Sequence, residues 1–192
     1  NLLVDRGTIT APQGMHITSS NGFVFLCSRA LGLNSYTAAN TPSLLGNYAV
    51  DAQDGVARGK VVYLAAGVGG LKVLNMSNPA APVVLGSLIL PNNGNANLIV
   101  VNNDIAVVVD TTAKIHLIRV GPLDVWNPTP ITPTFLKTIN HGIPVNSMAV
   151  NDSLLATTAS GAVGIRLYNI QNPQSPGDGL IHQADLPDFP FF

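Results

Sequence analysis

Short apolar runs separated by turns rich in glycine, proline and asparagine form the dominant pattern of this chain. Residues 55–90 show the pattern most clearly. They read as a short strand, a glycine turn, an apolar strand, a glycine-rich turn and a third strand, and a fourth strand follows Asn78-Pro79. Apolar runs of four to eight residues that are bounded by turn residues predict β-strands rather than helices.

The same order of strands and turns recurs four times. In each unit the second strand is apolar at nearly every position, and the third strand alternates apolar and polar residues. We predict second strands at Phe23–Cys27, Val61–Ala65, Ile105–Val109 and Leu154–Thr158, and third strands at Gly32–Tyr36, Gly70–Leu74, Lys114–Ile118 and Gly164–Tyr168. An asparagine follows each third strand (Asn40, Asn78, Asn127 and Asn172), and in the last three units a proline comes directly after it.

A strand that is apolar on both sides suits a sheet that is covered on both faces. Four-stranded units of roughly 40–45 residues have the size of propeller blades, and each blade of a propeller lies between two neighbours. We therefore predict an all-β fold, a β-propeller, as a single region over residues 1–192 with units near 11–50, 51–90, 91–140 and 141–186. A β-solenoid stays open as an alternative, whereas no segment keeps a helical period without glycine or proline.

Residues 70–87 read GLKVLNMSNPAAPVVLGS. They resemble the LVIVD repeat, which in other proteins reads approximately GLxVxDVSNPxxPxxxGS, although Asn75 stands where that family has Asp. The likeness is good over 55–90, fair over 14–50 and 154–176, and loose over 95–140, where residues 122–133 predict a longer loop. The resemblance implies a propeller in a secreted or surface-located protein, and it transfers no catalytic residue because the family carries no single activity.

The outer strands predict an incomplete ring. Residues 2–10 and 180–186 both match the fourth-strand segment at 84–90. The sequence therefore predicts five outer strands for four units. We assign residues 1–10 to a preceding blade and expect an arc or half of a larger ring, completed by self-association or by further blades, because large apolar faces are rarely exposed in a monomer. Since the chain begins at Asn1 without a visible signal peptide, we expect a processed form or a fragment.

Composition narrows the function classes. Charged residues make up only 10% of the chain, Glu is absent, and the net charge is −1. Nucleic acid is therefore not expected as a partner, because phosphate binding needs clustered Lys and Arg. No apolar stretch is long enough to span a membrane, and the single cysteine, Cys27, lies in an apolar run that predicts a buried thiol.

The turns before the four innermost strands supply the first candidate site. We expect these turns near the mouth of the central channel, where their polar groups could hold a small ligand or a cation. The candidate residues are His16, Gln53, Asp54, Asn97, Asn146 and Ser147. His16 and Asp54 occupy the same repeat position in neighbouring units, which makes this pair the one to test. The alternative is that these groups satisfy turn backbones and bind water.

A second candidate set lies in the third strands, where Asn34, Lys72, His116 and Arg166 occupy one repeat position. This column could form a basic stripe for an anionic partner, with Lys72, His116 and Arg166 as its charged members, or it could be a solvated strand face. Trp126, the only tryptophan, lies in the predicted longer loop, where it could anchor a partner or pin the loop.

Motifs that carry catalysis are missing from the sequence. There is no HExxH helix, no GxSxG elbow and no phosphate loop followed by a helix, and the sequence predicts no metal or cofactor site. The first hypothesis is therefore a non-catalytic extracellular or cell-surface module for adhesion, assembly or ligand display, with a protein or glycan partner. The second is an enzyme or small-ligand binder whose site lies at the channel mouth.

Overall fold

The computed structural model describes residues 14–39, 41–159 and 164–173, and the backbone of residues 180–184. Over these residues the chain forms sixteen β-strands and one short 3-10 turn at Pro91–Asn93. The strands make four separate antiparallel sheets of four strands each, in which consecutive strands are neighbours. The predicted all-β fold and the predicted propeller are therefore confirmed.

Each sheet is one blade. Blade 1 contains β1 (Gly14–Ser20), β2 (Phe23–Ser28), β3 (Gly32–Thr37) and β4 (Leu44–Tyr48), and blade 2 contains β5 (Asp54–Arg58), β6 (Val61–Ala65), β7 (Leu71–Asn75) and β8 (Val83–Leu88). Blade 3 contains β9 (Ala96–Asn102), β10 (Ile105–Asp110), β11 (Lys114–Arg119) and β12 (Thr134–Asn140), and blade 4 contains β13 (Val145–Val150), β14 (Leu154–Ala159), β15 (Ile165–Asn169) and β16 (Leu180–Ala184).

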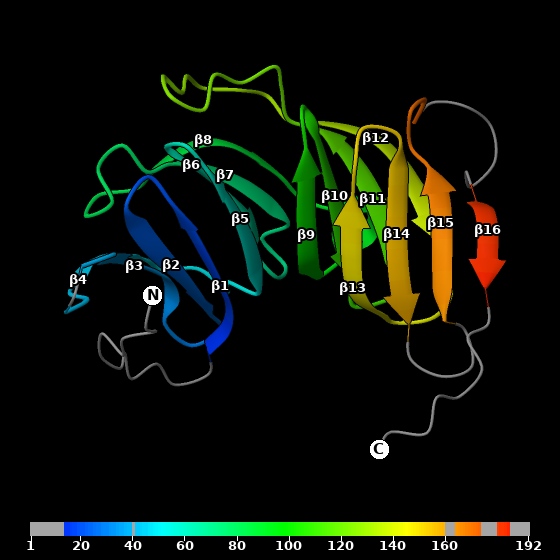
Figure 1. The fold of residues 1–192 in the computed structure, drawn as a ribbon, viewed down its shortest axis with the longest axis horizontal. Helices are drawn as coiled ribbons and strands as arrows, with labels where there is room; N and C mark the ends of the chain where they lie inside the picture. Colours follow the sequence, from blue (N-terminus) through cyan, green and yellow to red (C-terminus); the bar gives the residue numbers. More distant parts are fainter. Residues whose placement is uncertain (1–13, 40, 160–163, 174–179, 185–192) are drawn as a thin grey trace, which may run out of the picture.

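The innermost strands stand side by side in the order β1, β5, β9 and β13. Blades 1 and 4 lie at the two ends of this row (Figure 1). Each blade therefore has a leading face, turned toward the next blade in the sequence, and a trailing face, turned toward the preceding one. We keep these two names below.

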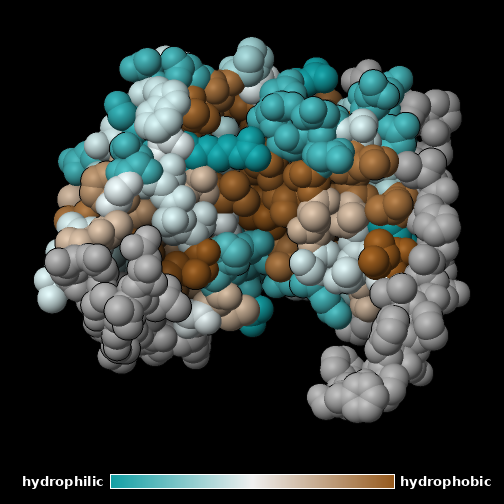
Figure 2. All heavy atoms as spheres, viewed as in Figure 1, coloured by the Kyte–Doolittle hydropathy of each residue, from teal (hydrophilic) through white to brown (hydrophobic). Residues whose placement is uncertain are grey.

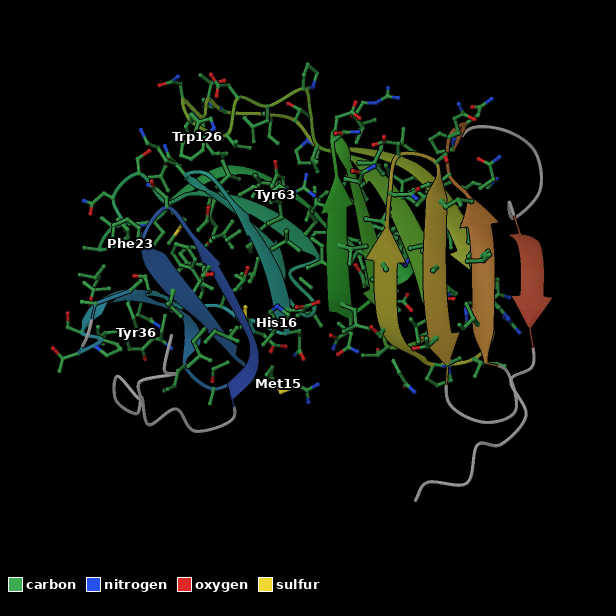
Figure 3. All side chains as sticks on the ribbon, viewed as in Figure 1. Met15, His16, Phe23, Tyr36, Tyr63 and Trp126 are labelled. Carbon is green, nitrogen blue, oxygen red and sulfur yellow. The ribbon has the colours of Figure 1, made fainter. Side chains whose placement is uncertain are left out.

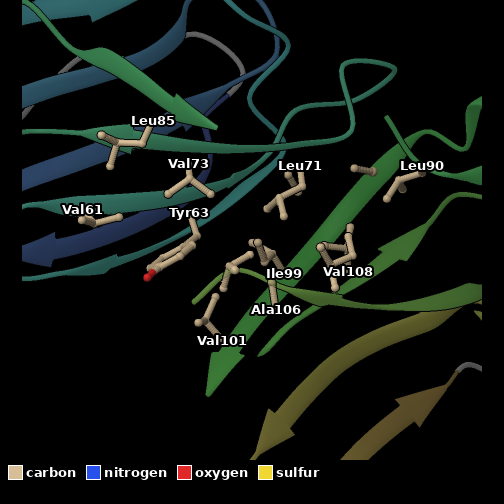
Figure 4. Packing of buried hydrophobic residues seen from close by; sticks show 14 residues of the cluster. Val61, Tyr63, Leu71, Val73, Leu85, Leu90, Ile99, Val101, Ala106 and Val108 are labelled. Atoms are coloured by element: carbon tan, nitrogen blue, oxygen red, sulfur yellow. The ribbon is translucent and has the colours of Figure 1, made fainter. Parts of the chain in front are cut away.

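The core lies between the blades rather than within one layer. Three apolar clusters fill the three spaces between successive blades. Between blades 2 and 3, Tyr63 and Val73 on the leading face of blade 2 pack with Ile99 and Val108 on the trailing face of blade 3 (Figure 4). The second strands β6 and β10 are buried at almost every position because a neighbour covers both of their faces.

In blades 2 and 3, the connections between third and fourth strands tie each blade to the one before it. The Ser35 hydroxyl of blade 1 donates to the Pro79 carbonyl of blade 2 over 2.6 Å. The long loop predicted at 122–133 lies across blade 2, where the Ile131 amide donates to the Leu85 carbonyl over 2.9 Å and the Lys60 amide donates to the Val125 carbonyl over 2.8 Å. Loops of this kind add backbone hydrogen bonds to the apolar contact between blades.

Two details of the predicted strands need correction. The third strands β3 and β11 do not alternate between buried and exposed residues, since even the polar Asn34 and His116 are buried. The predicted outer strand at 84–90 ends at Leu88, since Leu90 turns into the apolar cluster between blades 2 and 3. Strand β16 matches the segment predicted at 180–186 over its described part, and residues 2–10 lie outside the described residues.

The loop contact at Gly86 generates a first prediction. A Cβ atom added there would lie 2.7 Å from the Ile131 carbonyl oxygen and 2.8 Å from the Pro133 ring, so the loop would have to move. We expect Gly86→Ala to lower the free energy of unfolding by about 1–3 kcal/mol, as overpacking does elsewhere. Urea titration measures the change. Ser87→Ala, at the exposed neighbouring position, is the control and should change stability by less than about 0.5 kcal/mol.

Candidate functional site

The predicted channel-mouth residues lie at or near the beginnings of the four innermost strands. His16 lies in β1, Asp54 begins β5, Asn97 lies in β9, and Asn146 and Ser147 lie in β13. His16 and Met15 are drawn on β1 beside β5 (Figure 3). The row of blades therefore brings His16 next to Asp54, whereas Asn97 and Ser147 belong to the third and fourth blades.

His16 and Asp54 form an ion pair across the first two blades. The His16 Nδ1 lies 3.0 Å from the Asp54 Oδ1, and the two side chains are 45% and 9% exposed. The two residues hold the same repeat position, since His16 pairs with Cys27 in blade 1 and Asp54 pairs with Ala65 in blade 2. The hydrogen bond to the Asp54 carboxylate raises the pKa of His16 above its ordinary value, against the opposing effect of burial.

The Asp54 carboxylate also accepts two backbone amides. The Gly55 amide donates to Oδ1 and the Ile99 amide donates to Oδ2, each over 2.8 Å. Ile99 lies in β9, so this one carboxylate joins blades 1, 2 and 3. A second contact of the same kind exists, in which the Ala57 amide of β5 donates to the Thr18 hydroxyl of β1 over 3.1 Å. Each inner strand is an edge strand, so some of its backbone amides have no partner within its own sheet. Side chains of the neighbouring inner strand accept hydrogen bonds from these amides.

Gln53 is engaged in the same region. Its amide oxygen accepts from the Arg29 Nε over 2.6 Å, and its amide nitrogen donates to the Asp51 carboxylate over 2.6 Å. The Gln53 backbone amide donates to the Ala65 carbonyl, which fixes the residue at the start of β5. Gln53 therefore connects the turn after β2 with the segment that leads into blade 2.

Cys27 lies beside this cluster and is fully buried, as the sequence predicts. Burial, together with the nearby Asp54 charge, raises the pKa of its thiol to about 12. A thiol with such a pKa stays protonated at neutral pH, so Cys27 is a packing residue rather than a nucleophile.

A buried polar cluster between blades 2 and 3 was missed by the sequence analysis. The His116 Nε2 lies 3.1 Å from the Asp110 Oδ2, and the His116 Nδ1 lies 2.9 Å from the Thr138 hydroxyl. Burial alone would raise the pKa of Asp110, but hydrogen bonds from Thr112, Lys114 and His116 outweigh it and lower that pKa. The signal in the sequence was the polar Asp110 at the end of an apolar strand.

The column of Asn34, Lys72, His116 and Arg166 is therefore not an exposed basic stripe. His116 is fully buried and Asn34 is 5% exposed, while Lys72 and Arg166 are half-buried. Arg166 donates to the His141 carbonyl in the connection between blades 3 and 4. The Nε2 atom of His141 in turn lies 3.1 Å from the Thr157 hydroxyl. In blades 2 to 4 the column faces the preceding blade or its connection, and Asn34 in blade 1 is also buried, so neither the stripe nor the solvated face describes it.

Trp126 is 55% exposed on the long loop. The carboxylate of Asp124 accepts the Trp126 amide over 2.8 Å and so shapes the loop locally. Leu123, Val125 and Ile131 pack against the core between blades 2 and 3, and these residues, not the indole, hold the loop down. Trp126 therefore remains available as a contact residue.

Two open hollows lie on blade 1. One of about 360 Å³ is lined by Gly14, Met15, His16, Ile17 and Leu26, and one of about 650 Å³ lies along β3 and β4 with Asn34, Tyr36, Leu44 and Asn47 in its lining. Within the described residues, no three His, Cys or Asp side chains gather as a metal site would need. The described part of the chain also forms no helix that is long and apolar enough to cross a membrane.

Comparisons with known proteins place the chain among propellers by fold alone. The Cps50 (Swd1) β-propeller domain of Myceliophteria thermophila superposes with a TM-score of 0.68 at 10% identity, over 86% of this chain and 56% of that one. The computationally designed Ika8 protein gives 0.63 at 12% identity, over 88% and 48%. The designed Ika4 protein gives 0.62 at 16% identity, over 85% and 94%. The chain thus spans about half the length of Ika8 and of the Cps50 domain.

No protein-family model and no curated protein sequence matches the chain. The resemblance to the LVIVD repeat therefore stays a prediction from residues 70–87 and their counterparts in the other blades.

The geometry at Asp54 generates the second prediction. In Asp54→Asn the side-chain NH₂ group would face an amide donor, and the charge opposite His16 would be lost, so we expect the free energy of unfolding to fall by about 1–3 kcal/mol. Urea unfolding followed by circular dichroism measures the change. Asp104→Asn is the control because Asp104 is 43% exposed and lies 3.8 Å from Arg119, and it should cost about 0.5 kcal/mol or less.

The raised pKa of His16 generates the third prediction. A histidine whose pKa is raised by folding stabilises the fold fully below its ordinary value of 6.5, and that stabilisation is lost as the pH rises through the raised value. We expect the difference in unfolding free energy between the wild type and His16→Gln to be largest below pH 6.5, and to fall as the pH rises through the raised pKa of His16. The pKa of His141, which burial lowers, acts oppositely but is common to both proteins. An advantage that grows with rising pH would contradict the assignment.

Proposed function

We propose that this chain is a non-catalytic propeller module that works by binding protein surfaces through the uncovered end faces of its row of blades. The end faces are the trailing face of blade 1 and the leading face of blade 4. One contrast carries the proposal. The end faces expose apolar side chains, whereas His16, Asp54 and Gln53 near the inner strands already bind other groups of the chain.

The trailing face of blade 1 begins at its inner strand with exposed apolar groups. Ile17 is 62% exposed and Met15 is 47% exposed. At the other end of the row, Ala149 of β13 is exposed and Leu167 of β15 is half-buried. Hydrophobic side chains also gather over β9 and the fourth blade on the face drawn in Figure 2. Exposed apolar surface on this scale is typical of protein-binding surfaces.

The channel-mouth groups support a structural role instead. Asp54 uses both carboxylate oxygens to hold three blades, and Gln53 uses both atoms of its amide to hold Arg29 and Asp51. A catalytic or ligand-binding role needs polar groups that point toward an open space. His16 is 45% exposed beside the hollow of about 360 Å³, whereas the Asp54 carboxylate that it contacts is 9% exposed.

A location outside the cell or at its surface is part of this proposal. It rests on the resemblance to the LVIVD repeat and on a surface with few charges, and it makes a protein or glycan partner the expected class.

The fourth prediction tests whether protein covers the end faces. Single cysteines are introduced at exposed end-face positions by Ile17→Cys and Ala149→Cys, with Val83→Cys on the outer strand of blade 2 as the control, since Val83 is 60% exposed. The native Cys27 is buried and its thiol is protonated, so it does not interfere. We expect a maleimide to label both end-face cysteines several-fold more slowly than the control cysteine in extracts of the organism that encodes the chain.

The reference for that measurement is the unfolded protein, in which all three introduced cysteines should react at similar rates. End-face cysteines that react in the extract as fast as the control, after correction by that reference, would overturn the proposal. Protection of the control position to the same degree would contradict it too, because the protection would then not be specific to the end faces.

A further inference from the structure

We propose that the protein on the end faces is a second copy of this chain, bound head to tail, so that blade 4 of each copy covers blade 1 of the other. This inference rests on the proposed function, because it names the partner of the same two faces. Each end face has three equivalent faces that are already covered inside one chain.

The leading faces repeat one row of residues. In successive blades the middle of the second strand pairs with the middle of the third as Phe25 with Ser35, Tyr63 with Val73, Val107 with Leu117, and Ala156 with Leu167. The first three pairs are at most 1% exposed because the next blade covers them. Ala156 and Leu167 hold the same position in blade 4 and are only half-buried. The leading face of blade 4 thus has the strand pairing of the other three leading faces, but no following blade packs on it.

The trailing faces repeat a second row. The residue pairs at this position are Ile17 with Leu26, Gly55 with Leu64, Ile99 with Val108, and Met148 with Thr157. Leu64, Val108 and Thr157 are at most 1% exposed, whereas Leu26 is half-buried and Ile17 is 62% exposed. The first trailing face therefore lacks the blade that covers its three counterparts.

An unpartnered donor marks the same face. The side-chain nitrogen of Asn34 is buried and has no hydrogen-bond partner in the described part of the chain. At the equivalent position of blade 4, Arg166 donates through its terminal nitrogen to the carbonyl of His141 in the connection that precedes its own blade, while its buried Nε has no partner in the described part of the chain. Buried polar groups in folded proteins are almost always paired, and the Asn34 nitrogen lacks the kind of acceptor that the preceding connection gives Arg166.

The two end faces fit one another in kind and in charge. Inside the chain a leading face always meets a trailing face, in three separate interfaces, and no two faces of the same kind meet within the described residues. Among the described side chains the end rows are uncharged, with Ile17, Val24 and Leu26 on one face and Ala149, Ala156, Ile165 and Leu167 on the other. Burial of both rows therefore leaves no charge unpaired.

A second copy supplies both missing partners at once. Head-to-tail contacts close into a ring when the rotation between copies permits it, and the two contacts are then identical. A pairing of blade 1 with blade 1 would bring two trailing faces together, an arrangement that none of the three described interfaces shows. The second copy is consequently favoured in the head-to-tail arrangement.

The fifth prediction measures the mass of the assembly by sedimentation equilibrium on the purified full chain. We expect twice the 20.0 kDa of one chain. Ile17→Lys on one face and Leu167→Asp on the other should each weaken association roughly tenfold or more, because each alters both contacts of the ring. Val83→Lys, on an exposed outer strand, is the matched control and should leave association unchanged.

Mixing the two charged variants is the decisive step. A mixed pair keeps one unaltered contact and places lysine opposite the aspartate face in the other, so we expect the mixture to associate more tightly than either variant alone. Ala149→Asp at an exposed position replaces Leu167→Asp if the latter fails to fold by circular dichroism. A single-chain mass at all concentrations, or no recovery on mixing, would overturn the second copy as partner.

The outcomes separate this inference from the proposed function. End faces that are protected in the extract while the purified chain stays a monomer would contradict the second copy and leave the protein-binding module standing. End faces that are unprotected in both settings would contradict both.

Discussion

Burial of both faces of every sheet is the constraint on which the rest of this structure depends. A four-stranded sheet whose second strand reads VVYLA cannot leave either face in water without exposing a row of large apolar groups. The chain meets this need by placing each sheet between two others, so that its three apolar clusters lie between blades. The same need is unmet at the two ends of the row, where Ile17 of blade 1 and Ala149 of blade 4 are exposed, and the proposed binding rests on this difference.

Polar side chains fix the relation between blades that apolar packing alone leaves loose. Apolar contact is not directional, whereas a buried carboxylate needs donors at defined positions. Asp54 takes its donors from three blades and therefore sets their relative positions near the inner strands. Ser35 with Pro79 does the same work near the outer edge, between blades 1 and 2. His16, Asp54 and Gln53, which the sequence suggests as part of a ligand site, thus form contacts that hold neighbouring segments together.

The sequence predicted the fold well because each repeat combines a continuously apolar second strand with an alternating third strand, a combination that suits sheets packed between other sheets. The second strands were placed within one residue of their observed ends, since each is a short, mainly apolar run that begins directly after a turn. The sequence also singled out His16 and Asp54 as a pair, because equal positions in neighbouring repeats are expected at the same place in neighbouring blades. Its distance and the third partner, the Ile99 amide, could not be predicted, as both depend on how far one blade is turned against the next.

The misplaced column shows where such reasoning stops. Asn34, Lys72, His116 and Arg166 alternate with apolar neighbours, which in an ordinary sheet indicates a solvated face. In a propeller the face opposite an apolar row is covered as well, so a polar residue there needs a buried partner. Asp110 supplies one for His116 and the His141 carbonyl supplies one for Arg166, and both come from outside the third strands. Period-two alternation thus reports which residues share a face, while only the neighbouring blades decide whether that face meets water.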